Sequence, residues 1–135
     1  MTKADPLVYV QEACFWIKGH PEEFKRLMRL MHREVNRGNP SIQRGDVYKL
    51  AREAGFSVSE IDKLKRDNNI YAPLARYMVM LRPRLAKSIR FREAGADGVD
   101  MVAEWHSIVN AGTTFLANSR KEAQKLVELD DARAA

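Results

Sequence analysis

Apolar residues recur at three- and four-residue steps along most of the chain, which is the period of one buried helical face. The first such stretch covers residues 5–18 and stops at Gly19, a residue that often ends helices. The second covers residues 21–35 and has two carboxylates in its first turn, where the helix dipole favours them. We expect both stretches to be helices that form a hairpin within residues 1–38.

The helical period continues after the Gly-, Asn- and Pro-containing loop near residue 40. Three polar residues at 67–69 predict a break in the pattern, and the Gly-Thr-Thr run at 112–114 predicts another. The helix after the loop starts either at Ile42 or, because of Gly45, near Asp46. The further expected helices cover residues 42–54, 57–68, 71–81 and 83–93, with one or two more over 99–129.

Pro83 divides the basic part of the chain. Proline lacks an amide donor and disfavours helical geometry at the preceding residue, so we expect a boundary or kink at Arg82 and a new helix from Pro83 to Glu93. No strand pattern and no internal repeat accompanies these helices. The chain therefore predicts a compact all-α bundle of about six to eight helices.

Length and composition favour one globular domain. A chain of 135 residues with 45% apolar content can bury a real core. We divide this single domain into a hairpin (1–38), a basic core (42–93) and C-terminal helices (99–129). Its longest apolar runs are far shorter than the roughly 20 residues that span a bilayer, and Asp5 and Glu12 interrupt any secretion signal. We expect a cytoplasmic protein without a membrane partner.

The sequence offers little for catalysis or metal binding. Cys14 is the single cysteine and lies on an apolar helical face, which predicts an inert, buried thiol. The three histidines are not spaced with other ligands for a metal, and Glu104 and His106 point apart on a helix. No Gly-rich phosphate loop is present. We therefore expect a protein that is not an enzyme and has no catalytic residues, metal or cofactor.

The charge of the chain is unevenly distributed along its length. Residues 41–94 hold 12 basic and 6 acidic side chains, whereas residues 95–135 hold 4 basic and 7 acidic ones. A cationic middle attracts polyanions, nucleic acid above all. The acidic C-terminal part could bind the same basic surface, another protein or nothing.

A basic segment of residues 68–92 concentrates this charge. It contains six basic residues and no carboxylate, and its apolar residues keep the helical period, so we expect it to be half core and half cationic surface. The expected contacts for a nucleic acid or partner are Arg76, Arg82, Arg84, Lys87, Arg90 and Arg92. Tyr71 and Phe91 could stack on unpaired bases or belong to the core.

A short pattern just before this segment has the spacing of two helices joined by a tight turn. A small residue at Ala51, a glycine at Gly55, and apolar residues at Ile61 and Leu64 let one helix seat on another. The pattern resembles the helix-turn-helix of bacterial and phage repressors. That resemblance implies a second helix in the DNA major groove, with Ser59, Lys63 and Arg66 among the residues near base edges or phosphates. Glu60 and Asp62 weaken it, because carboxylates repel phosphates; an ordinary helical corner is the alternative.

The basic segment also carries a second resemblance. The runs at residues 71–77 and 82–86 look like segments of small helical proteins from actinobacterial phages and mobile elements. This likeness implies an origin and no residue roles.

Two functions fit these observations. The first is a DNA-binding protein of phage or mobile-element type, either a transcriptional regulator or a DNA-processing accessory, that holds DNA through a basic helical face. The alternative is a phage inhibitor that binds a host nuclease or CRISPR complex, in the manner of an anti-CRISPR protein. A homodimer is compatible with either function.

Overall fold

A computed structural model describes residues 5–66, 68–110 and 112–134. These residues form seven α-helices and two short 3₁₀-helices, and none of them lies in a β-strand. The all-α prediction is therefore confirmed. The elements are α1 (Pro6–Gly19), α2 (Pro21–Asn36), α3 (Arg44–Glu53), α4 (Val58–Arg66), α5 (Asn68–Leu81), η1 (Pro83–Lys87), η2 (Gly95–Gly98), α6 (Met101–Ile108) and α7 (Arg120–Ala134).

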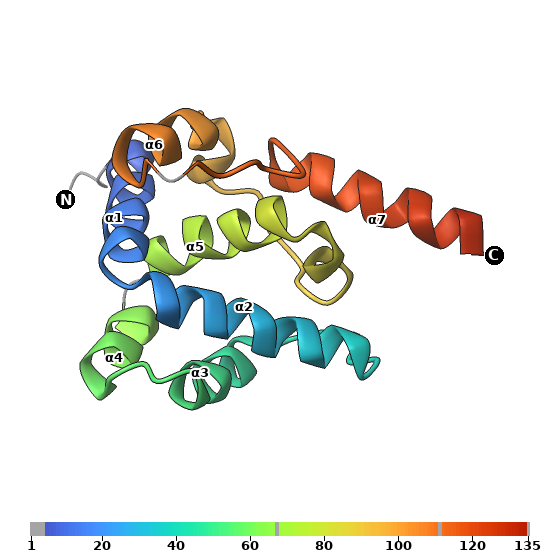
Figure 1. Ribbon diagram of the computed structural model, residues 1–135, viewed down its shortest axis with the longest axis horizontal. Helices are drawn as coiled ribbons and strands as arrows, with labels where there is room; N and C mark the ends of the chain where they lie inside the picture. Colours follow the sequence, from blue (N-terminus) through green and yellow to red (C-terminus); the bar gives the residue numbers. More distant parts are fainter. Residues whose placement is uncertain (1–4, 67, 111, 135) are drawn as a thin grey trace.

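Helix α5 is the centre of the fold (Figure 1). Helices α2, α3 and α4 lie on one side of it, and α6 and α7 lie on the other (Figure 1). Residues 73–81 are all buried, including Arg76, so neighbouring elements enclose this helix from Pro73 onward. Within the basic segment of residues 68–92, the expected cationic surface is found at Arg82, Arg84, Lys87, Arg90 and Arg92, which are exposed. Arg76 is the exception, because neighbouring elements cover the face of α5 that carries it.

Helices α1 and α2 meet at His20 at a steep angle instead of lying side by side (Figure 1). The buried row of α1, which includes Val10, Cys14 and Ile17, packs mainly on α5 and α6. Because α5 and α6 cover this apolar face of α1, little of it remains for α2 to pack against. The two helices therefore form a corner, and the predicted hairpin is not found.

The thiol of Cys14 is part of the core, as the sequence predicts. Its Sγ donates to Tyr77 Oη at 3.1 Å, and Tyr77 Oη donates to the carbonyl of Met101 at 2.7 Å. Burial is the main cause that raises the pKa of Cys14 to about 11, with the hydrogen bond to Tyr77 opposing it. The group is a neutral thiol at physiological pH and links α1, α5 and α6.

Several helix boundaries differ from the expected ones. Helix α5 already begins at Asn68, where a break was expected; Asp67 lies outside the described residues. The break near residues 112–114 is confirmed, since no described residue between Val109 and Ser119 is helical. Asn110 has a φ of 49° at the start of this connection, a conformation that asparagine tolerates better than most residues.

Candidate nucleic-acid interface

The helix that we expected up to Glu93 stops after η1: Ser88 closes its last turn, and residues 89–94 are not helical. The amide of Ile42 donates to the carbonyl of Ser88 at 2.8 Å, and Ser88 Oγ donates to the carbonyl of Asn39 at 2.6 Å. Further along, Arg76 Nη2 donates to the carbonyl of Arg92 at 2.9 Å. These long-range hydrogen bonds stabilise a conformation of the segment that is not helical. The prediction of a helix is therefore wrong beyond η1.

The extended segment alternates between core and solvent. Ile89 is buried and Phe91 is half-buried, whereas Arg90 and Arg92 are exposed. A period of two is the signature of extended backbone, whose successive side chains point to opposite faces. The alternation therefore presents two arginines on the same outer side of the segment.

A groove of about 650 Å³ lies between this segment, the start of α3 and the first turns of α5. We call it the arginine groove. It is lined by residues 41–44 and 89–94 together with Tyr71, Ala72, Ala75 and Arg76. It contains Arg76, Arg90 and Arg92 of the expected binding set, and it adds Arg44.

Arginines and aromatic rings are paired within the arginine groove. The guanidinium carbon of Arg44 lies 5.2 Å from the ring centroid of Tyr71, and that of Arg76 lies 5.1 Å from the ring centroid of Phe91. Both distances allow cation–π attraction. Burial raises the pKa of Tyr71 to about 12, with the nearby Arg44 opposing the rise, so its phenol stays neutral at physiological pH.

Arg76 supports the groove instead of facing a ligand. Its side chain is 2% exposed and donates to Asp97 at 2.9 and 3.1 Å. Arg120 of α7 donates to the same carboxylate through its Nε and Nη2 atoms, each at 3.1 Å. Burial alone would raise the pKa of Asp97, but the hydrogen bonds from the two arginines hold it well below its usual value. Arg76 is thus a structural residue, a correction to its expected place on the binding surface.

The exposed part of the arginine groove is cationic. In the part of the chain that the structure describes, Glu93 is the one carboxylate that lines it, and this side chain lies 3.0 Å from Lys121 Nζ. Neither Arg90 nor Arg92 has a carboxylate within ion-pair distance among the described residues. The two guanidinium groups are therefore available to an anionic ligand.

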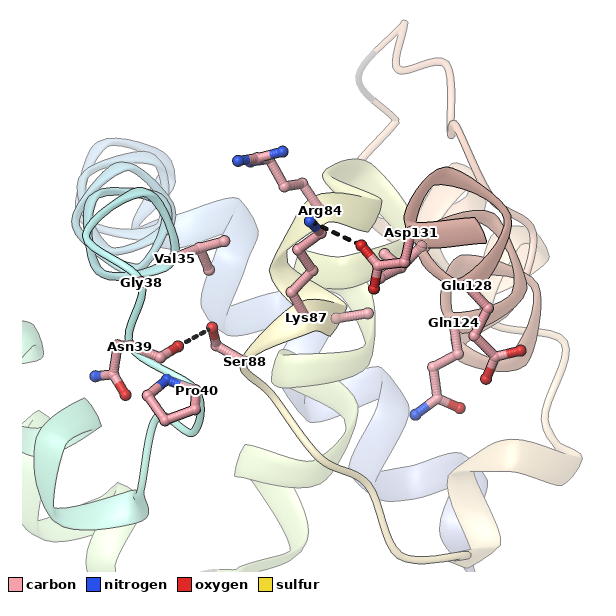
Figure 2. A pocket seen from close by; sticks show the side chains of 12 residues that line it. Val35, Gly38, Asn39, Pro40, Arg84, Lys87, Ser88, Gln124, Glu128 and Asp131 are labelled. Carbon is pink, nitrogen blue, oxygen red and sulfur yellow. Dashed lines mark hydrogen bonds and ion pairs between the residues drawn. The ribbon is translucent and has the colours of Figure 1, made fainter. Parts of the chain in front are cut away.

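Arg84 and Lys87 lie in a different groove, between η1 and α7, which has a volume of about 430 Å³. Figure 2 shows Gln124, Glu128 and Asp131 of α7 on the side that faces Lys87. Lys87 Nζ lies 3.0 Å from Asp131 Oδ1, and Arg84 Nε donates to Asn36 Oδ1 at 3.1 Å. Asp131 of α7 therefore neutralises part of the basic segment.

Arg82 lies on a third part of the surface, beside Lys25 and Met28 of α2. Its guanidinium donates to the carbonyl of Leu81 at 2.9 Å. The structure thus distributes the six basic residues over a buried position and three separate hollows. They do not form one continuous face.

Helices α3 and α4 are joined by a tight turn at the position that the sequence pattern predicts. The amide of Phe56 donates to the carbonyl of Ala51 at 3.0 Å and that of Gly55 donates to Arg52 at 3.1 Å, the two bonds of a Schellman turn. Gly55 has a φ of +98°, as the pattern requires. Ala51, Ile61 and Leu64 are buried between the helices.

The exposed start of α4 carries Ser57, Val58 and Ser59, with the two serine hydroxyls 3.2 Å apart. The side chains of Lys63 and Arg66 lie outside the described residues. Glu60, which weakened the resemblance, turns toward His20, with Oε1 3.7 Å from Nε2. It is 24% exposed and presents little charge to an approaching phosphate.

Sequence reasoning missed Arg44 and Asp97. Arg44 stands two residues before the acidic cap of α3 and looks like an ordinary helix-start residue, so its stacking on Tyr71 has no local signal. Asp97 lies in a Gly-Ala-Asp-Gly run that reads as a loop. Its two arginine partners are 21 and 23 residues away. Only the fold brings these groups together.

Within the described residues, no group of His, Cys, Asp or Glu side chains is arranged to hold a metal ion. None of the described helices combines the length and the apolar character that crossing a membrane requires. Comparisons with protein-family models, curated proteins and solved structures give no match to this chain.

Proposed function

We propose that this protein is a non-enzymatic nucleic-acid-binding protein that holds DNA at the arginine groove. The observation that carries the proposal is the presence of exposed Arg90 and Arg92 in the same groove as the stacked pair of Arg44 and Tyr71. Guanidinium groups match the geometry of phosphate oxygens, and half-buried aromatic rings offer faces to bases. The groove combines both kinds of contact.

The affinity is expected to come mainly from phosphate contacts. Each neutralised phosphate of duplex DNA contributes about 0.9 to the negative slope of log K against log salt. Arg90 and Arg92 together therefore account for a slope of about two. Between about 50 and 150 mM salt, these two contacts therefore weaken binding about sevenfold.

The α3–α4 corner favours duplex DNA as the ligand. Arg44 in the first turn of α3 lines the arginine groove together with Tyr71, so the corner adjoins the groove through α3. Val58 is 73% exposed at the start of α4. Serine hydroxyls can bond to base edges, and valine methyl groups can contact the thymine methyl. A duplex held at the groove would place these side chains near its major groove.

Fluorescence anisotropy with labelled 20-mers, duplex and single-stranded, at salt concentrations from about 50 to 200 mM tests the proposal. The variant carries Arg90→Glu and Arg92→Glu. We expect its affinity for duplex DNA to fall at least tenfold and its salt slope to decrease by about two, because two phosphate contacts are lost.

A matched control carries Lys125→Glu and Arg133→Glu, two exposed residues of α7 that do not line the arginine groove. It changes the net charge by the same amount, and we expect its affinity to fall less than threefold. Equal losses in the two variants would show a response to net charge alone. Absence of binding to both nucleic acids at about 50 mM salt would overturn the proposal.

A further inference from the structure

A separate hollow of about 430 Å³ lies between α2, the end of α5 and the end of α6. Its floor is apolar and includes Phe24, Leu81, Trp105 and Val109. We call it the tryptophan pocket. It shares no lining residue with the arginine groove, so an inference about it does not depend on nucleic-acid binding.

The rim of the tryptophan pocket is cationic. Lys18, Lys25 and Arg82 line it, and no carboxylate of the described residues does. Arg82 donates only to a backbone carbonyl within the described residues, which leaves its positive charge uncompensated. Lys25 Nζ lies 3.9 Å from Glu22, and both side chains are more than half exposed, so this pair is weak.

Trp105 contributes a buried aromatic ring to the floor, since the residue is only 4% exposed. Thr113 and Thr114 provide two hydroxyl groups to the lining.

The dimensions fit a small molecule. Typical small-molecule sites have about 300 to 1,000 Å³, a mainly apolar lining and a few convergent polar groups. A neighbouring hollow of about 220 Å³ also contains Lys25, Met28 and Arg82, and it extends the cationic rim along α2 with Arg29 and His32. An apolar floor under a rim without carboxylates selects a ligand that has an apolar body and a negative head.

We propose that the tryptophan pocket binds a small organic anion with an apolar body, of the class of medium-chain carboxylates. The chain or ring of the ligand packs on Phe24 and Trp105. The negative head lies at the rim, where Arg82 and Lys25 compensate its charge. The apolar floor supplies most of the affinity and the rim supplies the preference for an anion.

Isothermal titration calorimetry on the full chain tests this inference with three probes of similar body and different head: decanoate, decanol and decyltrimethylammonium. We expect decanoate to bind at least tenfold more tightly than decanol and the cation not to bind. Arg82→Gln, an exposed substitution, is expected to weaken decanoate binding about tenfold and to leave decanol unchanged. The control Arg90→Gln, in the arginine groove, is expected to change neither.

Equal affinities for decanoate and decanol would overturn the proposal, because the rim would then play no part. The same holds if Arg90→Gln weakens decanoate binding as much as Arg82→Gln, or if no decanoate binds at about 1 mM. All these results are independent of DNA binding, so a failure here is distinguishable from a failure of the proposed function.

Discussion

Asp97 is the residue on which the shape of the arginine groove depends most. Its carboxylate accepts from Arg76 and Arg120, and its Oδ2 also accepts from the amide of Ala94 at 3.1 Å. Arg76 in turn binds the carbonyl of Arg92. One carboxylate therefore joins α5, α7 and the extended segment that carries the exposed arginines. Its loss affects both stability and the position of the groove.

Asp97→Asn is expected to lower the free energy of unfolding by about 3 kcal/mol, because it leaves two buried guanidinium groups without their counter-charge. Urea unfolding at pH 7 measures this loss. The matched control is Glu93→Gln, an 80% exposed neighbour that is expected to change stability by less than about 0.5 kcal/mol. A stability of Asp97→Asn equal to that of the control would contradict a structural role.

The low pKa of Asp97 also predicts how stability varies with pH. The pKa is lower in the folded than in the unfolded chain, so the contribution of Asp97 is present above the unfolded value of about 3.9 and is lost as the pH falls toward the folded value. Wild-type protein therefore loses stability below about pH 4. The Asp97→Asn variant lacks this titration, so its free energy of unfolding is expected to fall less steeply than that of the wild type as the pH decreases.

The same residue shows why the binding set was predicted only in part. Charge and spacing place arginines correctly in a basic segment, but they do not tell which of them finds a buried partner. Arg76 differs from Arg90 and Arg92 through its buried partners, Asp97 and the carbonyl of Arg92, both of which are distant in sequence. Long-range compensation of this kind leaves no local signal.

At the scale of the elements, the α3–α4 corner depends on the backbone conformation of Gly55. An added Cβ there would meet only Arg26 Nη2, at 3.4 Å, so space is not the limiting factor. The φ of +98° is the constraint, because side chains with a Cβ are strained in that region. The corner therefore needs glycine for its turn and not for close packing.

Gly55→Ala is expected to destabilise the protein by about 1 kcal/mol through this strain. Gly45→Ala gives a control of opposite sign: Gly45 lies in the first turn of α3, has a helical backbone and has open space around it. Alanine there is expected to stabilise by about 0.5 kcal/mol, since it restricts the unfolded chain. Thermal unfolding of both variants checks the pair. Stabilisation by both substitutions would show that the turn relaxes without cost.

The elements also show where reading the sequence succeeds. Helices whose apolar residues follow the 3.6 period over several turns, such as α1, α2 and α3, were predicted to within a few residues. The segment after Lys87 was not, because its alternation covers only residues 89–92 and Pro83 suits the start of a helix. Hydrogen bonds to Asn39, Ile42 and Arg76 decide its extended form.

At the scale of the whole molecule, the fold changes the meaning of the charge distribution. The basic segment and the acidic C-terminal part are separate in sequence, but α7 packs on η1 and brings carboxylates to Lys87 (Figure 2). Arg90 and Arg92 lie outside this neutralised groove. Part of the excess positive charge is therefore masked by the chain itself, whereas Arg90 and Arg92 at the arginine groove are not paired with a carboxylate among the described residues.

Asp131→Asn tests this masking. Asp131 is the ion-pair partner of Lys87, so its neutralisation releases a positive charge next to η1. We expect the affinity for duplex DNA to rise about twofold to threefold, and the salt slope to become steeper by up to about 0.9. Asp130→Asn is the matched control, because it makes the same charge change at an exposed position that has no ion-pair partner among the described residues. The control is expected to change the affinity less and to leave the slope unaltered. Identical curves for the two variants in fluorescence anisotropy would mean that DNA responds only to net charge and does not reach Lys87.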